Sequence, residues 1–190
     1  MIDIHKSYLE PFFKEMNHKY KNNWCVLHSY ETLPFFSNSD VDMAFSDIET
    51  CYYYILKDKN SEVYLALDFL IDNKGVGRYG FKTSILTNKC RVIRSSIPVP
   101  NHEVAITYKF TKRIVKKREL IEDIKYMDYH FKRSNRNNLM LLLESQFGKK
   151  SLGLINKCLE NKNYLIDDTD CNILLKNRKK QYNYSANFKI

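Results

Sequence analysis

Glycine and proline are scarce in this sequence, with 5 glycines and 4 prolines among 190 residues. Disordered and low-complexity segments are usually rich in such residues, so their scarcity argues against long segments of that kind. The sequence has no apolar run of about 18 residues, the length that a membrane-spanning helix needs. The residues after Met1 also lack the apolar core of a signal peptide. With 44% apolar and 14% aromatic residues, we expect a folded cytoplasmic protein with no membrane span.

Motifs for several common kinds of site are also missing. No Cys-x-x-Cys pair and no Cys/His cluster with zinc-ligand spacing occurs. The histidines form no metal-binding or catalytic set by spacing, and there is neither a Ser-His-Asp arrangement nor a Walker-type glycine-rich loop. The cysteines are expected to be reduced and mostly buried thiols; they are Cys25, Cys51, Cys90, Cys158 and Cys171.

Charge is distributed unevenly along the chain. Residues 1–100 contain 12 Lys+Arg and 12 Asp+Glu, whereas residues 101–190 contain 19 Lys+Arg and 10 Asp+Glu, a net charge of +9. This asymmetry suggests a phosphorylated ligand held between an acidic and a basic half, although a solvated helical surface would give the same count.

Hydrophobic periodicity predicts an α+β fold in two parts: an α/β core over 1–97 and a helical C-terminal part over 98–190. Residues 95–100, which include two prolines, are the best candidate for a linker. In the first part we expect a helix over 5–20, strands over 24–28, 40–45 and 62–71, and a helix from 46 or 47 to about 57. In the second part we expect helices at about 102–117, 119–133, 136–147, 151–161 and 170–180.

Three aspartates stand out among these elements. Asp40 and Asp42 begin a predicted strand, and residues two apart in a strand project to the same face. Asp68 interrupts the apolar strand over 62–71, where a carboxylate is costly to bury unless it is paired or bound to metal. If the two strands are neighbours, all three carboxylates could converge on one or two Mg²⁺ ions. The alternative is structural: Asp40 and Asp42 would cap the strand entry, and Asp68 would pair with Arg78 or Lys82.

The segment Val26-Leu27-His28-Ser29-Tyr30, followed after nine residues by Asp40-Val41-Asp42-Met43, resembles the signature of nucleotidyltransferases of the DNA polymerase β superfamily. The similarity is to its minimal members, which are like kanamycin nucleotidyltransferase. Asp68 looks like the third carboxylate of that family. The resemblance covers residues 24–72 and extends more loosely to the helical part, which in the minimal members packs beside the sheet.

The resemblance implies a small mixed β-sheet of the nucleotidyltransferase type, flanked by helices, and it implies the role of each site residue. Asp40 and Asp42 would be the metal ligands, and Asp68 would be the general base or a third ligand. A turn would hold the nucleotide phosphates, formed by Ser29 and Tyr30, or by His28 and Ser29 in a second register, with Ser39 nearby. This turn has no glycine: Ser29 stands at the family's glycine position, and its side chain narrows the space for a phosphate.

Basic residues provide further candidate contacts. Lys109, Lys112 and Lys116 share one face of a predicted helix and, in line with the resemblance, would neutralise the β- and γ-phosphates; solvent exposure is the alternative. Arg78 and Lys82, beside Gly80, are candidate acceptor or phosphate contacts. This region and Pro98-Val99-Pro100-Asn101-His102 more loosely resemble small nucleotidyltransferase-like proteins associated with bacterial surface-polysaccharide synthesis.

The leading hypothesis is therefore an enzyme that transfers a nucleoside monophosphate from a nucleoside triphosphate to a hydroxyl or amine, with Mg²⁺, and releases pyrophosphate. ATP is the default donor, and the acceptor is a sugar, another small molecule, a protein or an RNA end. The first alternative is a weak or inactive member of the fold that binds a nucleotide or a protein partner. A second alternative, RNA binding through the basic helices, predicts salt-dependent affinity.

Overall fold

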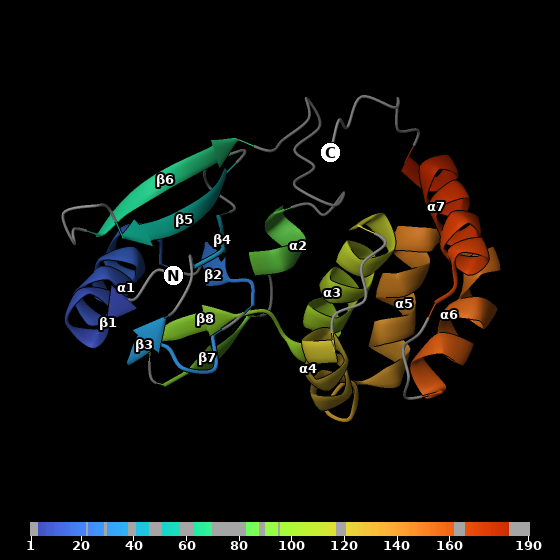
Figure 1. Ribbon diagram of the computed structural model, residues 1–190, viewed down its shortest axis with the longest axis horizontal. Coiled ribbons are helices and arrows are strands. Elements are labelled where there is room, and N and C mark those ends of the chain that lie inside the picture. The colour runs from blue at the N-terminus through green and yellow to red at the C-terminus, as the bar shows by residue number, and fades with distance from the viewer. Residues whose placement is uncertain are drawn as a thin grey trace. The chain divides into compact units, whose positions relative to one another are not determined.

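The computed structural model divides the chain into two units, residues 1–101 and 102–190, whereas the sequence predicted a boundary between 97 and 98. The residues that the structure describes are 4–21, 23–28, 30–37, 41–45, 51–57, 63–69, 83–87, 90–94, 96–116, 121–161 and 166–182. They form seven α-helices and eight strands, so the coarse prediction of an α+β protein is confirmed (Figure 1).

The first unit is built on a four-stranded sheet of order β2-β4-β5-β6, in which every neighbouring pair is antiparallel. Two further strand pairs, β1 with β3 and β7 with β8, are also antiparallel. The strands are β1 (Ile4–His5), β2 (Trp24–Val26), β3 (Phe36–Ser37), β4 (Met43–Phe45), β5 (Cys51–Lys57), β6 (Val63–Phe69), β7 (Arg91–Ile93) and β8 (Ile97–Val99).

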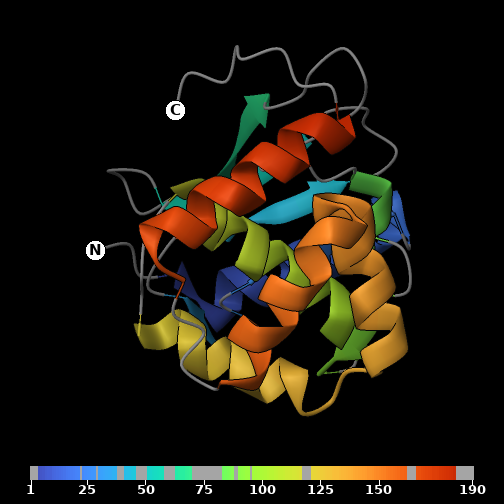
Figure 2. The same ribbon diagram turned by 90° about the vertical axis from the view of Figure 1, so that its right-hand side faces the viewer.

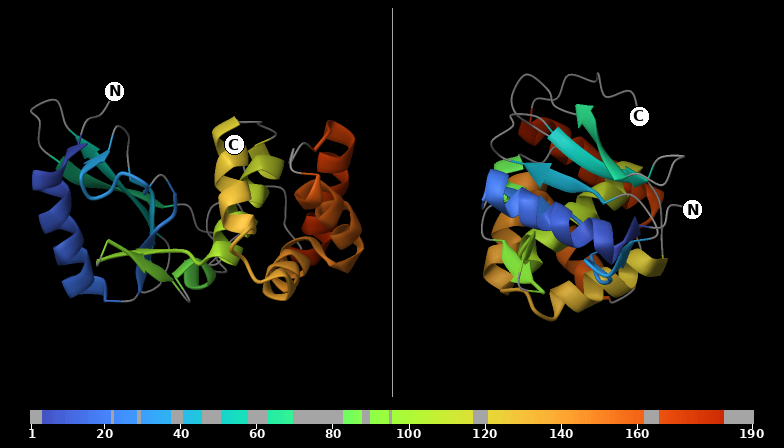
Figure 3. Two further views of the ribbon diagram at one scale, coloured as in Figure 1. Left: turned by 90° about the horizontal axis from the view of Figure 1, so that it is seen from below. Right: turned by 90° about the vertical axis from the view of Figure 1, so that its left-hand side faces the viewer.

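Helix α1 (Lys6–Tyr20) packs against this sheet (Figure 3). Its buried side chains recur at helical spacing, and Phe13 stacks on Trp24 of β2 with ring centroids 5.9 Å apart. Tyr20 meets Phe45 of β4 edge-on at 4.7 Å. The short helix α2 (Thr83–Thr87) contacts β2 and β4. The core of this unit therefore lies where α1 and α2 cover the β2–β4 pair.

The helix predicted from 46 or 47 to 57 is wrong, because Cys51–Lys57 forms β5. The run Tyr52-Tyr53-Tyr54-Ile55 consists of residues that favour strands, and β5 pairs with β6 over its whole length. The prediction of a mixed sheet fails for the same reason. A helical crossover would have made β4 and β6 parallel neighbours, whereas β5 lies between them and pairs antiparallel with both.

The predicted linker over 95–100 contributes strand β8 instead, since Ile97, Pro98 and Val99 pair with β7. Proline has no amide hydrogen to donate to a neighbouring strand. In a two-stranded ribbon each strand has an outer edge, where that hydrogen bond is not needed. The predicted strand over 40–45 begins later than expected, at Met43.

The second unit is a helical bundle (Figure 2). Its helices lie close to the predicted ranges and are α3 (His102–Lys116), α4 (Ile121–Phe131), α5 (Arg136–Phe147), α6 (Leu152–Glu160) and α7 (Asp168–Tyr182), with a 3₁₀ turn at Lys149–Ser151. Asn135 caps α5, because its side chain accepts a hydrogen bond from the Asn138 amide at 3.1 Å. Gly148 ends the same helix at φ 79°, a conformation that glycine adopts readily.

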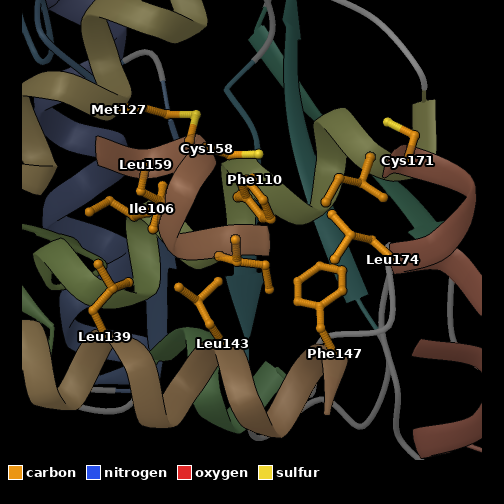
Figure 4. Packing of buried hydrophobic residues seen from close by; sticks show 12 residues of the cluster. Ile106, Phe110, Met127, Leu139, Leu143, Phe147, Cys158, Leu159, Cys171 and Leu174 are labelled. Carbon is orange, nitrogen blue, oxygen red and sulfur yellow. The ribbon is translucent and has the colours of Figure 1, made fainter. Parts of the chain in front are cut away.

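Apolar side chains at every fourth position of α5 form the centre of this bundle. Leu139, Leu143 and Phe147 project towards α3, and the Phe147 ring meets Phe110 edge-on at 5.7 Å (Figure 4). The remaining members of the buried cluster come from α3, α4, α6 and α7: Ile106, Ile114, Met127, Ile155, Cys158, Leu159, Cys171 and Leu174. No helix among the described residues is long and apolar enough to span a bilayer.

Candidate active site

Asp42 and His28 meet where the β2–β4 pair ends. The Leu27 amide donates to the Asp42 carbonyl at 2.9 Å, so the strand pairing continues one step beyond Val26 and Met43. His28 Nε2 lies 2.7 Å from Asp42 Oδ2, and the two side chains are 14% and 17% exposed. The shielded position strengthens this contact relative to a surface pair.

The local sequence explains this geometry. Val26, Leu27, Val41 and Met43 are buried, and their burial fixes the register of the two strands. His28 lies one position past Leu27, which is opposite Asp42. The chain bends at His28, so its side chain reaches Asp42 where the regular strand pairing ends. The sequence suggested His28 as a member of the turn in its second register but did not predict its contact with Asp42, because that contact depends on the pairing of two separate strands.

Asp68 is located by the backbone of β6. Asp68 pairs with Tyr52 on β5, and Tyr52 pairs with Ala44 on β4. Ala44 is two residues after Asp42, so Asp68 is two strands across the sheet and two residues along from Asp42. Strand spacing then puts the backbones of Asp42 and Asp68 about 12 Å apart. The intervening β5 makes this separation larger than the prediction of neighbouring strands implied. Asp40, Ser29, Ser39, Arg78 and Lys82 lie outside the described residues, and their roles stay predictions.

Tyr30, a predicted member of the phosphate turn, is 5% exposed. Its hydroxyl accepts a hydrogen bond from Arg91 Nη2 at 2.8 Å, and the Arg91 guanidinium lies 5.3 Å from the ring centroid. Arg91 Nε also donates to the Pro100 carbonyl at 3.3 Å. The structure thus adds a half-buried cation, which the sequence did not predict, in contact with Tyr30.

The lysines predicted to bind phosphate belong to the second unit. Lys109 is 9% exposed, and its ammonium lies 5.2 Å from the Tyr126 ring centroid, an arrangement in which the ring face stabilises the cation. Lys112, one turn further along α3, is half-buried. The solvent exposure considered as the alternative for these lysines therefore does not apply to Lys109.

The second unit also contains a contact between two histidines that the sequence did not predict. His102 and His130 come from α3 and α4, and their Nδ1 atoms lie 2.9 Å apart, so one ring donates to the other. His130 is 1% exposed and packs against the rings of Tyr126 and Tyr129. Their separation of 28 positions carries no signal in the sequence, because the contact depends on how α3 packs against α4.

Within the described residues, no group of three or more His, Cys, Asp or Glu side chains is arranged to hold a metal ion. Asp40 is not among these residues, so the predicted carboxylate set is only partly covered by this finding. Comparisons of the chain with protein-family models, with curated proteins and with solved structures find no match. The assignment of function therefore depends on the chemistry of the site.

Proposed function

We propose that the protein is a magnesium-dependent nucleotidyltransferase, with its active site at the end of the β2–β4 pair. One observation carries the proposal: Asp42, a predicted metal ligand, is joined to the segment that leads into the predicted phosphate turn. The two contacts that join them are a backbone hydrogen bond with Leu27 and a side-chain contact with His28. In such an enzyme a carboxylate and a phosphate-binding turn must lie side by side, and these two contacts support that arrangement.

The donor set suits magnesium. Mg²⁺ prefers a few carboxylates together with water and substrate phosphates, and Asp40, Asp42 and Asp68 would provide hard oxygen ligands only. Ligating carboxylates are commonly held by hydrogen bonds of their own, as His28 holds Asp42 Oδ2. A backbone separation of about 12 Å suits Asp68 better to a second ion or to the acceptor than to an ion shared with Asp42.

Each residue would have a distinct part in the reaction. Asp40 and Asp42 would bind the metal, His28 would fix the orientation of Asp42, and Asp68 would take the proton from an acceptor hydroxyl or amine. The deprotonated acceptor would then attack the α-phosphorus of the nucleoside triphosphate, and pyrophosphate would leave. Magnesium, when bound, supplies charge stabilisation for the attacking and leaving oxygens.

Two observations favour the alternative of a non-catalytic nucleotide-binding or protein-binding partner. His28 already engages one oxygen of Asp42, and no glycine occurs between Trp24 and Phe45 to let a phosphate approach the backbone. A purely structural contact that holds the two strand ends together, called a clasp below, needs only His28 and Asp42. The two functions differ in turnover, which an experiment can measure.

The test compares wild type with Asp40→Asn and Asp42→Asn by calorimetry with Mg²⁺ and ATP and by assays of nucleotide transfer. We expect both variants to bind Mg²⁺–ATP at least about tenfold more weakly, because each loses a charged ligand. Asp128→Asn is the matched control, since Asp128 on α4 forms an ion pair only with Lys132, just past the end of that helix, among the contacts described. Unchanged binding in both variants would overturn the site, and binding without transfer to any acceptor would favour the non-catalytic partner.

A further inference from the structure

Two cysteines far apart in the sequence converge on one carbonyl group in the first unit. Cys25 lies in the middle of β2 and is fully buried, whereas Cys90 lies just before β7 and is half-buried. Cys25 Sγ donates to the Leu86 carbonyl at 3.3 Å, and Cys90 Sγ lies 3.5 Å from the same oxygen. The two sulfur atoms therefore cannot be farther apart than these two distances combined.

Cys90 Sγ also lies 3.2 Å from the Thr87 carbonyl. Leu86 and Thr87 end α2, where helix carbonyls have no partner within the helix. While both thiols are protonated, each can donate its single hydrogen to one of these carbonyl groups at the end of α2. Both thiols are held in place by the end of the same short helix, and this positions them beside each other without a covalent bond.

The two thiols differ in chemistry as well as in exposure. When Cys90 ionises, the single S–H of Cys25 can turn from the Leu86 carbonyl to the Cys90 sulfur, and this hydrogen bond lowers the pKa of Cys90 from its ordinary value. Burial raises the pKa of Cys25 well above its ordinary value. The more accessible sulfur is therefore the one that ionises first, and the thiolate is the reactive form of cysteine. In the second unit, burial raises the pKa of Cys158 instead.

We propose that Cys25 and Cys90 are a redox-active dithiol that a hydroperoxide converts into an intramolecular disulfide. With hydrogen peroxide as the oxidant, the Cys90 thiolate attacks one peroxide oxygen, the O–O bond breaks, and the hydroxide that leaves takes up a proton; Cys90 becomes a sulfenic acid. Cys25 Sγ then attacks the Cys90 sulfur, the S–O bond breaks, and water leaves with the Cys25 proton. The two thiols lose two electrons, and hydrogen peroxide gains them as it becomes two molecules of water.

Oxidation would also change the end of α2. The disulfide removes both S–H donors, so the Leu86 and Thr87 carbonyls lose these hydrogen bonds. It also ties β2 to the beginning of β7. Trp24, the single tryptophan of the chain, is adjacent to Cys25 and fully buried, so its fluorescence provides a second readout of the reaction.

The test uses the reduced full-length protein, treated with hydrogen peroxide and digested without reductant for mass spectrometry. We expect a cross-linked peptide pair that contains Cys25 and Cys90 and has lost two hydrogen atoms. In Cys25→Ser, dimedone should trap Cys90 as the sulfenic acid, because the second thiol is missing. In Cys158→Ser, the matched control, the disulfide should form at the wild-type rate.

A measurement on the wild-type protein keeps the proposal falsifiable even if a variant fails to fold. At pH 7, iodoacetamide should label Cys90 at least about tenfold faster than Cys158. The reason is that Cys90 has the lowered pKa and forms the reactive thiolate more readily, whereas burial raises the pKa of Cys158. Equal labelling rates, or a peroxide-induced disulfide that pairs Cys90 with any cysteine other than Cys25, would overturn the proposal. So would peroxide treatment that leaves both thiols reduced.

Discussion

The contact between His28 and Asp42 can be weighed with a double-mutant cycle. A hydrogen bond to a charged group contributes about 1.5–3 kcal/mol, and removing one partner leaves the other unsatisfied. Because both side chains are at least four-fifths buried, water cannot fully replace the lost partner. We expect His28→Ala and Asp42→Ala each to lower the free energy of unfolding by about 1–3 kcal/mol, with a coupling energy of about 1–2 kcal/mol.

Urea denaturation followed by Trp24 fluorescence is the right assay for this cycle. Trp24 is the only tryptophan, and its fully buried ring lies in β2, four positions before His28, so its signal reports the first unit. Lys6 and Glu10 provide a control cycle in the same unit, with an exposed ion pair of 3.3 Å on α1. That pair should couple by about 0.3–0.5 kcal/mol.

A coupling energy at His28 and Asp42 no larger than that of the control pair would refute the reasoning. It would mean that the two strand ends are held by backbone pairing alone. The contact would then be neither a structural clasp nor a means of orienting a ligand.

Three further predictions concern packing, helix propensity and thiol reactivity. Leu143→Ala should lower the stability of the second unit by about 2–5 kcal/mol, measured by thermal unfolding, because it leaves a cavity in a fully buried cluster. Gly153→Ala should raise stability by about 0.4–1 kcal/mol in the same assay, because an added Cβ meets no atom within 4 Å in α6. Since a hydrogen bond from Cys25 lowers the pKa of Cys90, Cys90 should be alkylated at lower pH than an ordinary thiol. Cys25→Ala should move its alkylation midpoint to higher pH, and an unmoved midpoint would contradict the assigned cause.

The helices of the second unit were predictable because their signals are local. Asn135 begins α5 as a cap and Gly148 ends it, and the apolar positions between them recur every fourth residue, from Leu139 to Phe147. Such signals survive in any tertiary context because each involves residues within one or two turns.

The prediction failed where local signals were ambiguous. The apolar residues over 48–55 fit a helical period, but the tyrosines of β5 favour a strand, and pairing with β6 decided between the two. Because β5 lies between β4 and β6, these strands are not neighbours. The predicted convergence of Asp40, Asp42 and Asp68 therefore no longer follows from the pairing of two adjacent strands. The His28–Asp42 and His102–His130 contacts were invisible for a related reason, since each depends on packing between separate elements.

The stability of Asp42→Asn distinguishes the two roles open to this residue. Asparagine can still accept a hydrogen bond from His28 but carries no charge. If Asp42 serves only to clasp the strand ends, the loss of the charged acceptor should destabilise the first unit, as truncation does. If Asp42 is a metal ligand with Asp40 two residues away, the metal-free protein bears repulsion between like charges, and the neutral variant relieves it. Because His28 contacts Asp42 in both roles, a catalytic site predicts that Asp42→Asn loses less stability in urea than Asp42→Ala while it loses Mg²⁺–ATP binding. A loss of stability equal to that of Asp42→Ala, with unchanged Mg²⁺–ATP binding, would identify a purely structural contact.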